Sequence, residues 1–168
     1  MIISLLIYII ICLIGYVIMS QLYKNGVMET LPMPKSEWLY YLIQFTWGMF
    51  ANLLGVILAT ILICFGFRPY WYGRNFSFAL PINSGMSLEI FLFGPENAST
   101  NLKNHEHGHS IQNLYFGPLF LGMVAIPSVT RFWVRELRIK KGEKLKTKYD
   151  DIWFEGQASK TGDKFMNR

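Results

Sequence analysis

The sequence IISLLIYIIICLIGYVIMSQLY, residues 2–23, contains no charged side chain. A helix rises about 1.5 Å per residue, so roughly 20 apolar residues cross the hydrocarbon core of a bilayer. No basic residue precedes this stretch and no small-residue cleavage site follows it, which argues against a cleaved signal peptide. Residues 2–23 are therefore expected to form a transmembrane helix.

A second uncharged stretch, WLYYLIQFTWGMFANLLGVILATILICFGF, covers residues 38–67. It is long enough to span a bilayer with tilt, and its aromatic start is typical of a helix end at the membrane interface. The composition agrees, because 52% of the 168 residues are hydrophobic and only 16% are charged. We expect a mainly α-helical integral membrane protein with two transmembrane helices. Residues 1–67 would form a transmembrane hairpin, and residues 68–168 a membrane-associated region.

The net charge of +5 is concentrated after the second stretch. Lys24 and Lys35 lie between the two apolar stretches, and the other fourteen Lys and Arg residues follow Phe67. Basic residues favour the cytoplasmic side, so the chain after residue 67 and the short N-terminus are both expected there. The basic segment 131–148 then contacts anionic lipid headgroups, and no nucleic-acid partner is expected. The expected location is a membrane that the chain crosses more than once.

The region between residues 68 and 100 is rich in Gly and Pro and is expected to be irregular. Within it, Phe76–Leu80 and Ser87–Phe93 are expected as strands or extended runs. Residues 100–115 are expected to form a helix, which Ser99 or Thr100 can cap and Gly117-Pro118 ends.

The apolar stretch 118–134 is short, and Pro127 interrupts it. A third full span there would place basic residues on opposite sides of the membrane. A re-entrant or interfacial segment keeps them on one side and is the interpretation that we favour. A short C-terminal helix is expected from Asp150 to about Lys160.

All three histidines lie within the motif His105-Glu106-His107-Gly108-His109, which has the pattern HExxH. Residues four apart share one face of a helix, so His105 and His109 can bind one metal ion together. Glu106 is then placed to act as general base on a water molecule. Neutral imidazoles suit zinc and leave room for a third protein ligand. His107 lies on another face, where it either supports the ligands from behind or is solvated; we favour the solvated position. The alternative is an exposed polar helix end that binds no metal.

No further histidine remains, so the third ligand is expected to be a carboxylate. We favour Glu155, because apolar residues in the segment 153–158 can pack against the membrane part and turn this acid toward the histidines. Asp151 is the second choice. The downstream acids that come into question are Glu136, Glu143, Asp150, Asp151, Glu155 and Asp163.

The two histidines with a later Glu155-x-x-Ala158 resemble the gluzincin metallopeptidases, in which a Glu on a following helix completes an HExxH site. Further residues resemble small bacterial membrane proteins with an HExGHxxQ signature: His109-x-x-Gln112, Leu114-x-x-Gly117-Pro118 and Ile126-Pro127-Ser128. The resemblance implies His105, His109 and Glu155 as zinc ligands, Glu106 as the base and a bacterial inner-membrane location. Where the family has an Asp after Ala, this chain has Ser159, which hints at reduced activity.

Gln112 lies one turn beyond His109 on the same helix face and can bond either a ligand histidine or a substrate carbonyl. Gln112 and Ser159 are therefore candidates for residues that support the ligands. The expected function is a zinc-dependent peptidase that cleaves peptides or membrane-protein substrates at or near the cytoplasmic membrane face. The alternatives are an inactive metal-binding scaffold and a membrane adaptor whose histidines are incidental. A transporter is disfavoured, since neither apolar stretch carries a charge.

Overall fold

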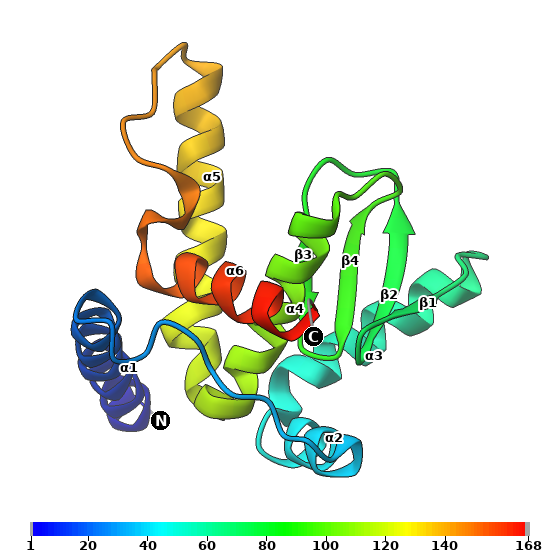
Figure 1. Ribbon diagram of the computed structural model, residues 1–168, viewed down its shortest axis with the longest axis horizontal. Helices are drawn as coiled ribbons and strands as arrows, with labels where there is room; N and C mark the ends of the chain where they lie inside the picture. Colours follow the sequence, from blue (N-terminus) through cyan, green and yellow to red (C-terminus); the bar gives the residue numbers. More distant parts are fainter. Residues whose placement is uncertain (1, 167–168) are drawn as a thin grey trace. The chain divides into compact units, whose positions relative to one another are not determined.

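The computed structural model describes residues 2–166, which form two compact units. Of the described residues, the first unit combines 2–29 with 119–157, and the second combines 30–118 with 158–166. Figure 1 shows the elements in sequence colours. Each unit therefore joins segments that are far apart along the chain.

The first unit contains helix α1 (Ile2–Lys24), the apolar helix expected from the sequence. Within the described residues, it is the single helix that is long and apolar enough to cross a membrane, with a mean hydropathy of 2.9. Its small residues allow close packing, because a Cβ on Gly15 would lie 2.7 Å from Met123 Sδ. Most of its side chains are exposed, as suits a helix whose solvent is lipid.

The same unit holds a π-helical turn (Leu121–Ala125) and helix α5 (Ile126–Lys140). Pro127 does not end the helical run: it lies in the first turn of α5, directly after the π-helical turn. A 3-10 turn (Tyr149–Asp151) precedes helix α6 (Trp153–Met166), which extends beyond the predicted end near Lys160. The first five residues of α6 belong to this unit and the rest to the second.

The second apolar stretch is not one straight span, which corrects the expectation for residues 38–67. It forms α2 (Glu37–Thr46) and α3 (Met49–Cys64), which meet at 95°. The number of spans rises to as many as three if each of two bent helix pairs is one span. The two-helix transmembrane hairpin and the multi-pass topology therefore stay predictions.

Buried amides explain this bend. Asn113 Nδ2 donates to Gln44 Oε1 over 2.9 Å, and Asn52 Nδ2 donates to the Gln44 carbonyl over 2.6 Å. A Cβ at Gly48 would lie 2.0 Å from Asn113 Nδ2, so only a glycine leaves room for that side chain. Unpaired amide donors are costly in an apolar setting, and the bend gives the Nδ2 groups of Asn52 and Asn113 acceptors.

A four-stranded sheet of order β1-β2-β4-β3 lies in the second unit. Its strands are β1 (Tyr70–Tyr72), β2 (Asn75–Leu80), β3 (Met86–Leu88) and β4 (Phe91–Pro95). Strands β2 and β4 are parallel, and the other pairs are antiparallel. The expected single run Ser87–Phe93 is therefore two strands, because the chain turns at Glu89, which has a φ of 64°.

The two faces of the sheet have different partners. Phe76, Phe78, Phe91 and Phe93 form a chain of aromatic contacts, and Phe91 packs against Gly55 of α3. Side chains alternate along a strand, so neighbouring residues such as Ser77 and Leu92 face the other way. They line a cavity together with residues of α4 (Thr100–Phe116). This side of the sheet therefore faces Glu106 of the HExxH motif.

Candidate metal centre

Helix α4 positions the HExxH motif, and its ends agree with the sequence prediction. The Ser99 hydroxyl accepts a hydrogen bond from the Leu102 N–H, which caps the first turn. The helix ends at Gly117, whose φ of 48° favours glycine. His105, His109 and Gln112 lie at spacings of four and three, so they share one face of α4.

Each motif histidine is oriented by a side-chain partner at Nδ1. His105 Nδ1 lies 2.8 Å from Ser159 Oγ, and His109 Nδ1 lies 2.8 Å from Gln112 Oε1. An amide oxygen only accepts, so Nδ1 of a neutral His109 carries the proton, and its Nε2 carries the lone pair. A hydrogen bond at one ring nitrogen that directs the other toward a metal is the usual arrangement of ligand histidines.

Helix α6 lies directly against α4 because glycines remove the side chains between them. A Cβ on Gly108 would lie 1.9 Å from the Ala158 carbonyl oxygen, and one on Gly162 would lie 1.8 Å from the Asn104 carbonyl oxygen. Asn104 Nδ2 also donates to Asp163 Oδ1 over 2.8 Å. The glycine within HExGH is thus explained by helix packing.

Glu155 lies one helical turn before Ser159 on α6, so the two residues share a face. The Ser128 hydroxyl donates to Glu155 Oε1 over 2.7 Å and orients the carboxylate. His105, His109 and Glu155 each offer a ligand atom, and these atoms lie within 4.8 Å of one another. The group can therefore bind a metal ion. Two imidazoles with one carboxylate form a donor set that suits zinc.

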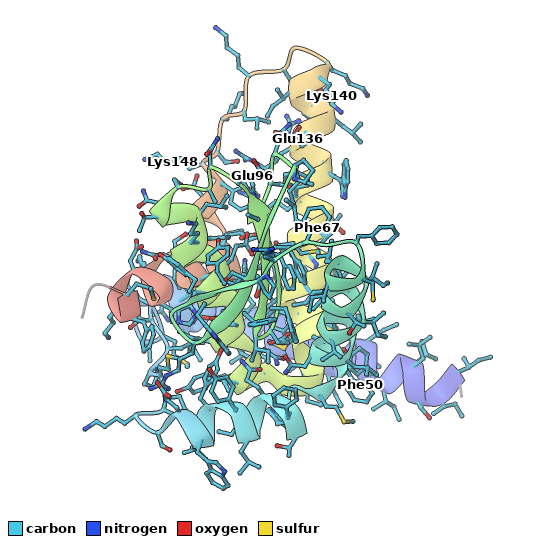
Figure 2. The ribbon with its side chains drawn as sticks, turned by 90° about the vertical axis from the view of Figure 1, so that its right-hand side faces the viewer. Phe50, Phe67, Glu96, Glu136, Lys140 and Lys148 are labelled. Atoms are coloured by element: carbon cyan, nitrogen blue, oxygen red, sulfur yellow. The ribbon has the colours of Figure 1, made fainter. Side chains whose placement is uncertain are left out.

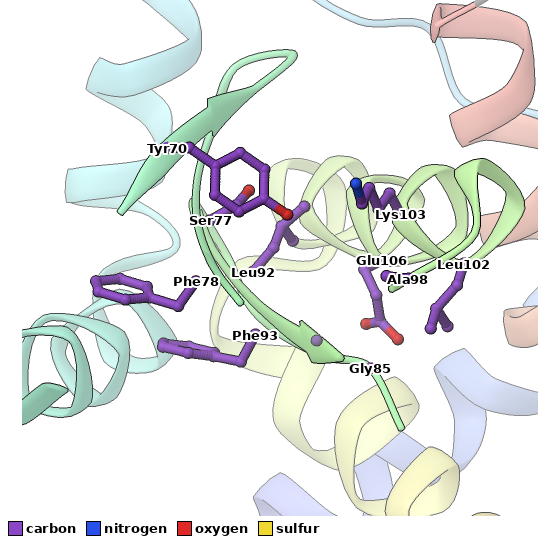
Figure 3. A pocket seen from close by; sticks show the side chains of 11 residues that line it. Tyr70, Ser77, Phe78, Gly85, Leu92, Phe93, Ala98, Leu102, Lys103 and Glu106 are labelled. Carbon is purple, nitrogen blue, oxygen red and sulfur yellow. The ribbon is translucent and has the colours of Figure 1, made fainter. Parts of the chain in front are cut away.

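Glu106 points from α4 toward Gly85 and the sheet (Figure 3). Its side chain is only 8% exposed and lines a cavity of about 20 Å³ with Ser77, Leu92 and Lys103. A cavity of roughly 10–15 Å³ or more is enough for one water. Gly85, the residue before β3, lies so close that a Cβ there would be 2.4 Å from Glu106 Oε1. The carboxylate is thus held beside a space the size of a water molecule.

His107 is buried, which corrects the expectation that it is solvated. Its Nδ1 contacts Asn75 Oδ1, and its ring packs against Phe165 at a centroid distance of 4.9 Å. Burial, with a smaller contribution from the Arg74 charge, lowers the pKa of His107 to about 4. His107 therefore joins α4 to the sheet as a neutral core residue.

The other candidate acids have different partners. Asp151, the second choice for the third ligand, accepts a hydrogen bond from the Lys148 N–H over 2.7 Å. Asp163 accepts from Asn104, and Glu143 pairs with Arg138. In the part of the chain that the structure describes, the metal-ligand group contains Glu155 and none of these.

Sequence reasoning assigned no role to Ser128, which appears only within the Ile126-Pro127-Ser128 match, or to Gly85. Ser128 stands 27 positions before Glu155, and a lone serine carries no signal of such a long-range bond. Gly85 lies in an irregular stretch, where a glycine is explained by any turn. No family model, curated protein or solved structure matches this chain.

Proposed function

We propose that the chain is a membrane-bound, zinc-dependent peptidase that hydrolyses peptide bonds at or near the cytoplasmic membrane face. The observation that carries the proposal is the group His105, His109 and Glu155, whose ligand atoms lie within 4.8 Å of one another on helices that also position Glu106. When bound, a zinc ion supplies Lewis-acid polarisation of the scissile carbonyl. The residue contacts at each ligand support the same function.

The protein side of the reaction would rest on Glu106. Its carboxylate takes a proton from the attacking water and passes it to the leaving amine. The nearly buried position strengthens its electrostatic interaction with the reacting groups. Lys103 lines the same cavity, and its ammonium lies over the rings of Tyr70 and Tyr72, so a positive charge also faces this space.

A peptide substrate would add to the edge of the sheet. Strand β3 is an edge strand, and Gly85 just before it contacts the Glu106 side chain. Backbone hydrogen bonds to an edge strand hold a peptide without requiring a particular sequence. The cavity has room for a water molecule but not for a peptide, so Gly85 would have to move to admit one.

Membrane attachment would come from α1, with the α2–α3 pair as a broken second span. Two crossings place both termini on the cytoplasmic side, where the basic residues are favoured. The resemblance of the motif region to small bacterial membrane proteins supports a bacterial inner membrane.

The second candidate is a metal-binding scaffold without hydrolysis. The small volume beside Glu106 favours it, and so does Ser159 at the position where the gluzincin pattern has an acid. Both candidates require the metal group, and they differ in whether Glu106 does chemistry.

The test compares membranes of cells that express the wild type or Glu106→Gln, with new peptide N-termini identified by mass spectrometry. Gln keeps the shape and removes the base, so hydrolysis should fall by about 100-fold or more while zinc stays bound. New N-termini in the wild type alone support the peptidase. Identical N-termini in both samples, with zinc bound in both, favour the scaffold.

A further inference from the structure

Helix α5 presents an exposed apolar face and a partly exposed cationic face, and none of its residues is buried. Val129, Trp133 and Leu137 repeat at spacings of four and are each more than half exposed. Arg131, Arg135 and Arg138 follow the same period on another side of the helix. An exposed helix with an aromatic–aliphatic face and a cationic face is typical of a membrane surface.

The arginine face borders a cleft of about 510 Å³ between α5 and residues 145–152. Arg131 Nη2 donates to the Lys148 and Tyr149 carbonyls over 2.8 and 3.0 Å, and Arg135 Nη1 donates to the Thr147 carbonyl over 2.9 Å. Both guanidinium groups also lie over the Tyr149 ring, at 5.8 and 5.7 Å. These contacts fix the arginines in place and so form the cleft.

Carbonyls and the Tyr149 ring orient Arg131 and Arg135 without neutralising them. Residues 131–148 hold eight Lys and Arg against two acids, Glu136 and Glu143. Glu143 pairs with Arg138 at 2.7 Å, and Asp151, just beyond the segment, caps the Lys148 N–H. Arg131 Nε is buried and has no hydrogen-bond partner among the described residues. The labels of Glu136, Lys140 and Lys148 in Figure 2 mark this basic part of the chain.

The cleft also has an apolar lining, formed by Ile126, Val134, Leu145 and Ile152. A cationic mouth over an apolar wall matches a ligand with an anionic head and a hydrocarbon tail. Guanidinium groups bind phosphate oxygens through paired N–H donors better than other cations do. The volume lies within the usual range for small-molecule sites.

We propose that the cleft between α5 and residues 145–152 binds a phosphate-bearing amphiphile, the headgroup and upper chain of an anionic phospholipid. The site is formed within one compact unit, and its lining includes none of the three metal ligands. Its occupant would hold α5 and the basic segment at the membrane surface. The function is specific lipid binding, beyond the diffuse attraction of a basic segment to anionic lipid.

The test is native mass spectrometry of the full chain in neutral detergent, with dilute dioleoyl phosphatidylglycerol or dioleoyl phosphatidylcholine. Without a charged membrane, diffuse attraction is small and a specific site stands out. The double variant Arg135→Gln/Arg138→Gln should bind phosphatidylglycerol about tenfold or more weakly, because charged hydrogen bonds to the phosphate are lost. The matched control Lys140→Gln/Lys141→Gln removes the same charge outside the cleft and should bind like the wild type.

A second variant, Thr130→Glu, adds a negative charge at an exposed cleft position and leaves the arginine contacts intact. It should also lose phosphatidylglycerol, which keeps the test valid if the arginine variant misfolds. An adduct that survives excess inorganic phosphate supports a lipid as the ligand, and displacement by inorganic phosphate supports free phosphate at the same site. Equal affinity for the two lipids, or equal losses in the arginine and lysine variants, would overturn the proposal.

Discussion

The substitution Gly108→Ala tests how closely α4 and α6 must pack to bring the metal ligands together. The new Cβ would lie 1.9, 2.6 and 2.8 Å from the carbonyl oxygen, carbonyl carbon and Cα of Ala158. These are backbone atoms, which cannot rotate away as a side chain can. Ordinary contacts begin near 3.4 Å, so the helices must separate by roughly 1.5 Å at this point.

Two opposing energies, helix propensity and overpacking, decide the stability of Gly108→Ala. Ala favours a helix over Gly by about 1 kcal/mol, whereas overpacking costs about 1–3 kcal/mol, toward the upper end where two backbones meet. The expected net loss of stability is about 1–2 kcal/mol. The same separation stretches the 2.8 Å contact between His105 Nδ1 and Ser159 Oγ beyond hydrogen-bond range. Losing such support typically weakens metal binding 10- to 100-fold.

The assays are thermal unfolding and zinc competition with a chelator, both on protein purified in detergent. The melting temperature of Gly108→Ala should fall by roughly 3–6 °C, together with the zinc affinity. Gly94→Ala is the control, because its nearest neighbour would be Ala98 Cβ at 3.9 Å. A Gly108→Ala protein that is more stable than the wild type, as helix propensity alone predicts, and that binds zinc normally would refute the close packing of α4 on α6.

Three further predictions concern single side chains. Ser159→Ala removes the hydroxyl at His105 and should weaken zinc binding about 10- to 100-fold with little effect on folding. Gly85→Ala should displace the Glu106 carboxylate, so hydrolysis falls while zinc content stays that of the wild type. Burial raises the pKa of the Glu89 carboxyl well above its usual range, so folding favours its neutral form. Its contribution to stability is present at acid pH and is lost as the pH rises, so Glu89→Gln should stabilise the protein at neutral and alkaline pH in denaturant titrations.

Each of these has a result that would contradict it. Unchanged chelator competition in Ser159→Ala would show that the hydroxyl does not support His105. Zinc loss in Gly85→Ala would place that glycine in the metal group and not beside the base. A Glu89→Gln protein that is less stable than the wild type at pH 8 would mean that Glu89 is ionised in the folded state.

Part of the fold could be predicted from local signals in the sequence. The uncharged run 2–23 and the cap and stop signals around the motif helix are properties of neighbouring residues, and α1 and α4 follow them. The bend at Gly48 was not predictable, because hydropathy counts the residues of the stretch and cannot include Asn113 of a later helix. The turn at Glu89 was also missed. An acid within a β-rich run usually marks an exposed strand position, and it does not signal a positive φ.

In the candidate site, too, local spacing could be predicted and long-range packing could not. The spacing of His105 and His109 follows from the helix period alone, whereas the position of Glu155 depends on how α6 packs on α4 through Gly108. His107 was expected in solvent because one face of the motif was assigned to the metal and the other to water. In the structure the sheet covers that second face, so helix position alone could not predict its burial.

Metal content is the most direct test of the central claim. Inductively coupled plasma mass spectrometry would be applied to detergent-purified wild type, His105→Ala, Glu155→Ala and, as a matched control, Asp151→Ala, after zinc is supplied and the excess removed. The account predicts one zinc per chain in the wild type and in Asp151→Ala, and none in the other two variants. A wild type without metal, or a Glu155→Ala protein that keeps its zinc, would contradict it.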